Sequence, residues 1–387
     1  QTAFGYTNTE MGMLMSVFGA MSMIGYFPGG WLSDRFPARY MMSAALLGTG
    51  IAGFYFSTLP SFAICLLIHA FWGLSITLLF WSSMIKTTRN WAREGEQGRT
   101  FGFLEGGRGI TEALSGSVFG LIFVSLGSSD LALTQVIILF SSTNILLALL
   151  VWFTLKDDEG KANETSETEK KKVTLQDIIE VLKLPEVWLI TIVIMSAYSG
   201  YWGAYYFAPY ATSAFSLSVG MGVAIGVGKV WLSPFAAFTS GFISDRVGVS
   251  RAVFSLLSLL VVTFFIFGIL PHNPNMFIPM LINVVITALA IFALRGIYFA
   301  LLEEGGIPAH VTGTAAGLVS AIGFLPDVYM PFIGGVILDA YPESIGYKYL
   351  FLMISGICLL GALAAFQIMR RSNARKSSEI STTIQKV

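Results

Sequence analysis

The chain has 387 residues, of which 55% are apolar and only 12% are charged, and its formal net charge is zero. Because an ordinary soluble domain has about a quarter charged residues, this composition excludes a typical soluble protein and favours a membrane protein. A net charge of zero also gives no general attraction to nucleic acid.

Long apolar stretches, separated by turns and charges, predict a chain that crosses the bilayer many times, since about 20 apolar residues span the hydrocarbon core. We therefore expect an all-α polytopic membrane protein. Eleven spans are predicted, at residues 8–33, 40–58, 61–86, 99–125, 131–154, 187–213, 218–243, 251–270, 276–301, 311–338 and 346–370.

The stretch "KDDEGKANETSETEKKKVTLQD" between the fifth and sixth spans is long and hydrophilic, which predicts a linker between two membrane domains. Within it, Thr174 followed by Asp177 indicates the start of a short surface helix. The predicted domains are an N-terminal bundle at 1–155, a linker at 156–186, a C-terminal bundle at 187–371 and a tail at 372–387.

The distribution of basic residues predicts the orientation of the chain. Threading the spans alternately through the bilayer places nearly all of the 23 lysines and arginines on one side. Such residues favour the cytoplasmic side of a membrane. We therefore expect a multi-pass protein of the inner or plasma membrane with its linker and C-terminus in the cytoplasm.

Two charged segments repeat about half the chain apart. The first, "GWLSDRFPAR", starts at Gly30 after the first span, and the second, "GFISDRVGVSR", starts at Gly241 after the seventh. Glycine-containing segments from residues 98 and 313 also align, with Glu112 opposite Asp327. The chain therefore contains two related halves, an arrangement found in secondary transporters.

The pattern G-x-L-x-D-R-x-x-x-R, met by the first segment and more weakly by the second, resembles the signature loop of the major facilitator superfamily. The resemblance implies two six-helix bundles related by pseudo-twofold symmetry, which alternate access to a central site. In that family the loop follows helices 2 and 8, which implies that the family's first helix is absent from this sequence.

In the same family the signature loops act as a latch on the cytoplasmic gate. The resemblance assigns this role to Asp34, Arg35, Arg39, Asp245, Arg246 and Arg251. The alternative is that these charges only set the topology of the chain.

Charged residues inside spans are energetically costly and therefore indicate function. Five are counted as deep in the spans, with Arg295 assigned to the inner end of its own span: Glu105, Arg108, Glu112, Lys229 and Asp327. At about 100° per residue the first three share one helix face, although Arg108 and Glu112 could also form an inert pair one turn apart. The resemblance implies that these helices lie near the interface between the halves, around a polar cavity.

The charges in the spans predict the chemistry of the ligand. Arg108 and Lys229 are donors that favour oxyanions, such as a carboxylate, a sugar acid, a phosphate ester or a sulfonate. Three acids against two bases require a protonated or paired acid, as proton-coupled symport would use. Asp327 is the preferred proton-coupling residue, with Glu112 and Glu105 as the others.

Aromatic residues in the spans are candidates for lining the cavity. We expect Tyr201 and Tyr205, one helical turn apart, and Trp231, beside Lys229, to contact the substrate. Trp and Tyr are also common at membrane interfaces, which is the alternative. His69 is expected to be a hydrogen-bonded histidine inside the helix bundle.

The segments "RGIYFALLEEGGIPAHVTGTAAGLVSAIGFLPD" and "GEQGRTFGFLEGGRG" resemble the branch of the family that transports organophosphates, sugar acids and related organic anions. We therefore expect a monomeric secondary active transporter for proton-coupled uptake of a small organic anion. The proton gradient would be its energy source, with no cofactor and no nucleic acid partner.

Two alternatives are a transporter-like sensor that binds a solute without moving it, and a drug or metabolite effluxer. No metal-ligand spacing or nucleophile pattern occurs among the three histidines, so the sequence does not predict an enzyme.

Overall fold

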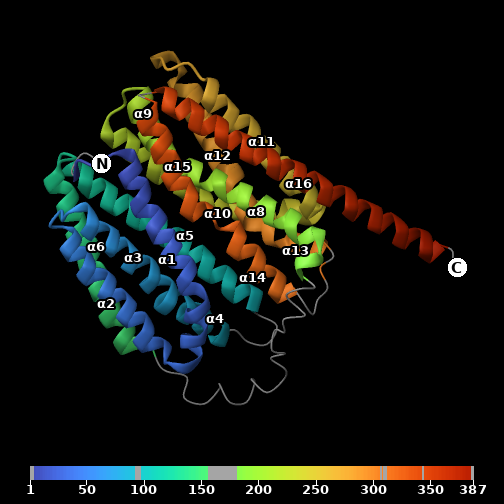
Figure 1. Ribbon diagram of the computed structural model, residues 1–387, viewed down its shortest axis with the longest axis horizontal. Helices are drawn as coiled ribbons and strands as arrows, with labels where there is room; N and C mark the ends of the chain where they lie inside the picture. The colour runs from blue at the N-terminus through green and yellow to red at the C-terminus, as the bar shows by residue number, and fades with distance from the viewer. Residues whose placement is uncertain are drawn as a thin grey trace. The chain divides into compact units, whose positions relative to one another are not determined.

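The computed structural model describes residues 4–91, 97–155, 181–305, 307, 312–341 and 344–384 (Figure 1). Over these residues all regular secondary structure is helical, which confirms the predicted all-α class. The helices form two compact units. The first contains Gln1–Lys171 and Asp327–Asp339, and the second contains Lys172–Pro326 and Ala340–Val387. The domain boundaries expected at 155, 186 and 371 stay a prediction.

The first unit packs by close helix contacts at small residues. Helix α1 lies against α3 and the π-helical segment η2, and α2 lies against α6. A Cβ atom at Gly73 would be 2.2 Å from the carbonyl oxygen of Phe18, so only glycine permits this approach of α3 to α1. The helices are α1 (Asn8–Arg35), α2 (Ala38–Phe56), α3 (Phe62–Ser75), η2 (Ile76–Trp81), α4 (Ser82–Trp91), α5 (Gln97–Ser125), α6 (Asp130–Thr154) and most of α15 (Pro326–Ala340).

Helix α15 belongs to this unit because it packs tightly along α1 (Figure 1). A Cβ atom at Gly12 would be 2.2 Å from the Pro331 carbonyl oxygen, and one at Gly335 would be 2.3 Å from that of Asn8. Glycines on both helices thus bring the two backbones into contact.

The second unit has an aromatic core. Phe207, Phe264, Phe267 and Phe351 are fully buried, with ring centroids 5.0 to 6.4 Å apart. Helices α11 and α16 pack along each other beside it. The helices are α8 (Pro185–Gly203), η3 (Ala204–Tyr206), α9 (Phe207–Ala214), α10 (Val219–Val247), α11 (Val249–Ile269), η4 (Pro274–Met276), α12 (Phe277–Ile297), η5 (Tyr298–Ala300), α13 (Leu301–Glu304), α14 (Thr312–Gly323) and α16 (Ser344–Ile384).

Among the described residues, eight helical stretches are long and apolar enough to cross a membrane. They are Phe62–Thr88, Asp130–Thr154, Pro185–Ala214, Val219–Val247, Val249–Ile269, Phe277–Glu304, Leu318–Ala340 and Ile345–Ala374. Helices α1, α2 and α5 coincide with three further predicted spans, but their glycine, serine and charged residues make them more polar. The expected eleven spans and the expected missing first helix therefore stay predictions.

One described segment continues further than predicted, and one predicted element lies outside the described residues. Helix α16 continues to Ile384, through most of the predicted tail at 372–387, because "RRSNARKSSEI" contains good helix formers and neither glycine nor proline (Figure 1). The predicted surface helix at Thr174 and Asp177, in the linker, lies outside the described residues.

Candidate functional site

A pair of tyrosines forms the centre of the candidate site in the second unit. The hydroxyl oxygens of Tyr201 and Tyr205 are 3.0 Å apart, and their rings meet edge to face with centroids 5.4 Å apart. Tyr201 is in the last turn of α8, and Tyr205 is in the 3₁₀ turn η3 that follows. Tyr205 is four residues before Pro209. Proline has no backbone N–H, so the α-helical hydrogen bond to the Tyr205 carbonyl cannot form.

Lys229 of α10 is the first cation beside this tyrosine pair. Its ammonium nitrogen is 4.8 Å from the Tyr205 ring centroid and 5.9 Å from that of Phe207. The same nitrogen donates a hydrogen bond to the carbonyl oxygen of Ala204, at the start of η3. The structure thus places Lys229 next to Tyr205, and the substrate-binding role of both residues stays a prediction.

Arg295 of α12 is the second cation, and it is not among the site residues predicted from the sequence. Its guanidinium carbon is 4.1 Å from the Tyr201 ring centroid and 6.0 Å from that of Tyr198. It also interacts electrostatically with Tyr205 and Tyr298. Arg295 is half-buried among tyrosines from α8, η3 and η5.

Arg295 was missed because it was assigned to the inner end of its span, where basic residues are common. The predicted span at 276–301 already extended past Arg295, and in the structure the apolar helical stretch continues through η5 and α13 to Glu304. The segment "IYFALL" after Arg295 is the signal that could have identified it as a charge within the membrane.

The first unit contains a separate cluster of charged and aromatic residues. The Arg108 guanidinium carbon of α5 is 4.7 Å from the Trp81 ring centroid. Tyr26 of α1 interacts electrostatically with both Arg108 and Asp327, the latter at the start of α15. One unit therefore brings together a predicted substrate-binding residue and the preferred proton-coupling residue.

The remaining predicted site residues are less informative. Glu112 lies one turn after Arg108 on an exposed face of α5, and Trp231 of α10 is 39% exposed. The side chain of Glu105 lies outside the described residues, although its backbone is helical. Their roles stay predictions.

The arginines of the first charged segment contact neighbouring aromatic residues. The guanidinium carbon of Arg35 is 3.8 Å from the Trp31 ring centroid, and Arg39 donates a hydrogen bond of 2.7 Å to the Tyr40 hydroxyl. Lys86 of α4 donates to the Ser33 carbonyl near the end of α1. The Asp34 side chain lies outside the described residues.

The second charged segment ends at the start of α11, and the residue that caps this helix is Glu304, which is not one of the predicted latch residues. Glu304 accepts hydrogen bonds of 2.8 Å from both the backbone N–H and the hydroxyl of Ser250, and one of 3.1 Å from the Ser372 hydroxyl. Asp245 and Arg246 are exposed in the last turn of α10. Sequence reasoning missed Glu304 because it is distant in sequence from the helix it caps.

Arg251 lies in the first turn of α11 and is exposed. Its guanidinium approaches the side-chain oxygen of Asn373 on α16 at 3.5 Å. This contact joins the second charged segment to α16, and the latch role of Arg251 stays a prediction.

The structure confirms the expected environment of His69. Its ring is buried, and Nδ1 is 2.8 Å from the carbonyl oxygen of Cys65 one turn earlier. The ring also meets Phe56 and Trp72 edge to face, at centroid distances of 5.6 and 5.1 Å. His69 is therefore part of the packing of α2 against α3.

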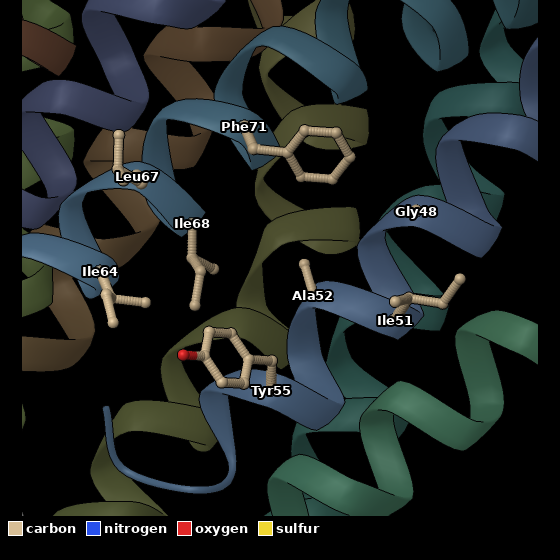
Figure 2. Close-up of a pocket in the computed structure, with 8 residues that line it drawn as sticks. All are labelled: Gly48, Ile51, Ala52, Tyr55, Ile64, Leu67, Ile68 and Phe71. Carbon is tan, nitrogen blue, oxygen red and sulfur yellow. The ribbon is translucent and has the colours of Figure 1, made fainter. Parts of the chain in front are cut away.

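An apolar groove lies between α2 and α3 in the first unit (Figure 2). Its volume is about 640 Å³, and the Tyr55 hydroxyl is the one polar side-chain group among the residues that line it. They are Gly48, Ile51, Ala52, Tyr55, Ile64, Leu67, Ile68 and Phe71. A groove of this composition does not suit a charged solute.

Comparison with known proteins agrees with this architecture. The chain is 30% identical over 373 residues to the inner membrane protein YqcE of Escherichia coli (strain K12), covering 94% of this chain and 86% of that protein. It is 24% identical over 381 residues to the hexuronate transporter of Bacillus subtilis (strain 168), covering 94% and 86%.

A solved structure has the same fold: a bacterial homolog of the human lysosomal transporter Spinster, in its inward-facing and unoccupied conformation. The TM-score is 0.77 at 14% sequence identity, over 95% of this chain and 90% of that one. The family model of the Major Facilitator Superfamily matches residues 1–331. The chain therefore belongs to the major facilitator superfamily, a family of membrane transporters rather than enzymes.

Proposed function

We propose that the protein takes up a small organic anion together with protons, by alternating access, as a monomer in the inner or plasma membrane. The observation that carries this proposal is the position of two cations, Lys229 and Arg295, against one tyrosine pair in the second unit. An ammonium and a guanidinium inside apolar helices are costly unless they bind something, and both favour oxyanions.

The substrate class has support from two sources. Tyr201 and Tyr205 add hydroxyl groups that can bond to a polar ligand. A relative named as a hexuronate transporter covers nearly the whole chain, and a hexuronate is a sugar acid. The name of the YqcE relative supports the inner membrane as the location.

Proton coupling has support from the first unit. Asp327 begins α15 and interacts electrostatically with Tyr26, which also interacts with Arg108. A carboxyl group in an apolar span is costly when ionised, so it can gain and lose a proton as its surroundings change. Glu112 and Glu105 are the second and third candidates, and the proton gradient would supply the energy without a cofactor.

The test is uptake by the purified protein in liposomes that contain a pH-sensitive dye. Sugar acids, phosphate esters, sulfonates and neutral sugars would be added outside in turn. We expect internal acidification with an anion, and loss of acidification in Asp327→Asn. Glu303→Gln, which changes an exposed acid of α13, is the matched control and should behave as wild type.

Two alternatives give different results in the same experiment. Binding of an anion without movement of solute or protons would favour a sensor. Export of a loaded solute driven by an inward proton gradient would favour an effluxer. Anion uptake without acidification, unchanged in Asp327→Asn, would contradict the proton-coupling role of Asp327.

A further inference from the structure

We propose that Arg295 is the principal anion-binding residue and that the ligand is a hydroxylated organic anion. Arg295 would hold the acid group, and the Tyr201–Tyr205 hydroxyl pair would hold hydroxyl groups beside it. This inference rests on the proposed function and deepens it by naming the anchor and the substrate class.

Arg295 has hydrogen-bonding capacity that the described part of the chain does not use. A guanidinium carries several N–H donors in a planar fork. Within the described residues its close contacts are with tyrosine rings, and no carboxylate or carbonyl oxygen accepts a hydrogen bond from it. A half-buried guanidinium with open donors is a site for an external oxyanion.

Lys229 differs from Arg295 in this respect. Its ammonium already donates to the Ala204 carbonyl, so part of its capacity is used within the protein. An ammonium also binds an anion as a point charge, whereas a guanidinium can bind both oxygens of a carboxylate, sulfonate or phosphate. Arg295 is therefore the stronger anchor of the two.

The ring of Tyr201 orients the Arg295 guanidinium for binding an anion at its edge. The ring lies 4.1 Å from the guanidinium carbon, which is the distance of a stacked contact over a ring face. Stacking covers one face of the guanidinium and holds its orientation, while the N–H groups at its edge remain accessible to an oxyanion. Tyr198 and Phe292 contact Tyr201 and restrict its ring in turn.

The tyrosine hydroxyls predict the rest of the ligand. The hydroxyl oxygens of Tyr201 and Tyr205, 3.0 Å apart, also carry lone pairs that can accept a hydrogen bond from a ligand hydroxyl. Tyr198 and Tyr298 bring two further hydroxyls within electrostatic reach of Arg295. A ligand with hydroxyl groups next to its acid group can donate hydrogen bonds to these oxygens, whereas an ionised aliphatic acid can only accept them.

The test is calorimetric binding to the purified full chain with three compounds of matched ring size. Glucuronate carries both the acid and the hydroxyls, glucose carries the hydroxyls alone, and cyclohexanecarboxylate carries the acid alone. Glucose 6-phosphate separates a carboxylate from a phosphate as the preferred acid group. We expect a sugar anion to bind at least about tenfold more tightly than glucose or cyclohexanecarboxylate.

The variants then test the anchor. Arg295→Gln should weaken binding of the sugar anion by about thirtyfold or more, and Arg295→Lys by a smaller factor. Tyr201→Phe should weaken it by about three- to tenfold. Lys229→Gln should have a smaller effect than Arg295→Gln. Arg370→Gln, at an exposed position of α16, is the matched control for loss of a positive charge.

The outcomes separate the two proposals. Sugar-anion binding that is unchanged in both Arg295→Gln and Tyr201→Phe would overturn this inference and leave the proposed function standing. Equal binding of glucuronate and cyclohexanecarboxylate would overturn the hydroxylated ligand. Binding of neither sugar anion to the wild-type protein would overturn this inference, and the proposed function would fail only if no anion causes acidification in the liposome experiment. If Arg295→Gln has a lower Tm than the wild type, its weaker binding could reflect misfolding, and Arg295→Lys, which keeps the charge, takes its place in the comparison.

Discussion

The carboxylate of Asp339 binds the N-terminus of α1 through Asn8. The backbone N–H and side-chain amide of Asn8 donate to one carboxylate oxygen at 3.0 and 2.8 Å, and the N–H of Thr9 donates to the other at 2.7 Å. The first N–H groups of a helix have no partner within the helix, so an acid from α15 satisfies them. This contact joins two helices that are more than 300 residues apart in sequence.

Substitution of Asp339 should weaken the contact between α1 and α15. Asp339→Asn removes the negative charge. Both carboxylate oxygens of Asp339 accept hydrogen bonds, whereas the asparagine side chain has one acceptor oxygen. We expect the Tm in detergent to fall by about 2 °C or more. Asp130→Asn, at an exposed acid in the first turn of α6, is the control. An equal Tm for the two variants would contradict a special role for Asp339.

A methyl group at Gly12 should separate the same two helices. Alanine is the better helix former by about 1 kcal/mol, but its Cβ would lie 2.2 Å from the Pro331 carbonyl oxygen. Gly12→Ala should therefore lower the Tm. Gly356→Ala on α16, where nothing lies within 4 Å of the added Cβ, should leave the Tm unchanged or raise it. The expectation fails if both variants respond alike.

Loss of the Glu304 side chain should loosen the start of α11. Glu304→Ala removes the acceptor of both Ser250 bonds and of the Ser372 hydroxyl bond. Removal of a helix cap costs about 1 kcal/mol. Hydrogen exchange of the Ser250 amide should become faster, and that of amides in the middle of α11 should not. The neighbouring exposed residue gives the control, Glu303→Ala, for which the Ser250 rate should stay as in wild type.

The stability of the second unit should depend on pH through His272, in the loop after α11. Burial lowers the pKa of His272, whose ring packs edge to face on Tyr210 and Phe215 at centroid distances of 5.6 and 5.9 Å. The folded protein thus binds fewer protons than the unfolded chain. Stability is then complete above the ordinary histidine pKa of about 6.5 and falls as the pH drops through it.

Thermal unfolding at about pH 7.5 and about pH 5.5 tests this expectation. The wild-type Tm should fall more between the two values than that of His272→Gln. The difference should be small because the ring is partly in contact with water. A larger fall in the variant would show that other groups control the dependence.

Some contacts in the structure follow from local patterns in the sequence. Tyr201 and Tyr205 are one turn apart in sequence, so their contact follows from helix geometry. The environment of His69 follows in the same way from its position within an apolar span. The all-α class follows from the long apolar stretches alone.

Contacts between distant segments could not be predicted in this way. The cap on α11 comes from Glu304, 54 positions away, and the cap on α1 comes from Asp339. Neither is marked by a local pattern. Arg295 was not selected for a different reason: it was assigned to the inner end of its span, and its contacts with tyrosines of α8 appear only in the folded structure.

The π-helical segment η2, at Ile76–Trp81, changes the phase of the helix in which it lies. A π turn holds more residues than an α turn, so side chains before and after it do not follow one 3.6-residue period. A helical wheel drawn over 62–91 would therefore assign the wrong direction to every residue after Trp81. Deletion of one residue within η2 would restore the α-helical period and leave α4, with Lys86, close to its present orientation relative to α3, because a π turn accommodates one more residue than an α turn.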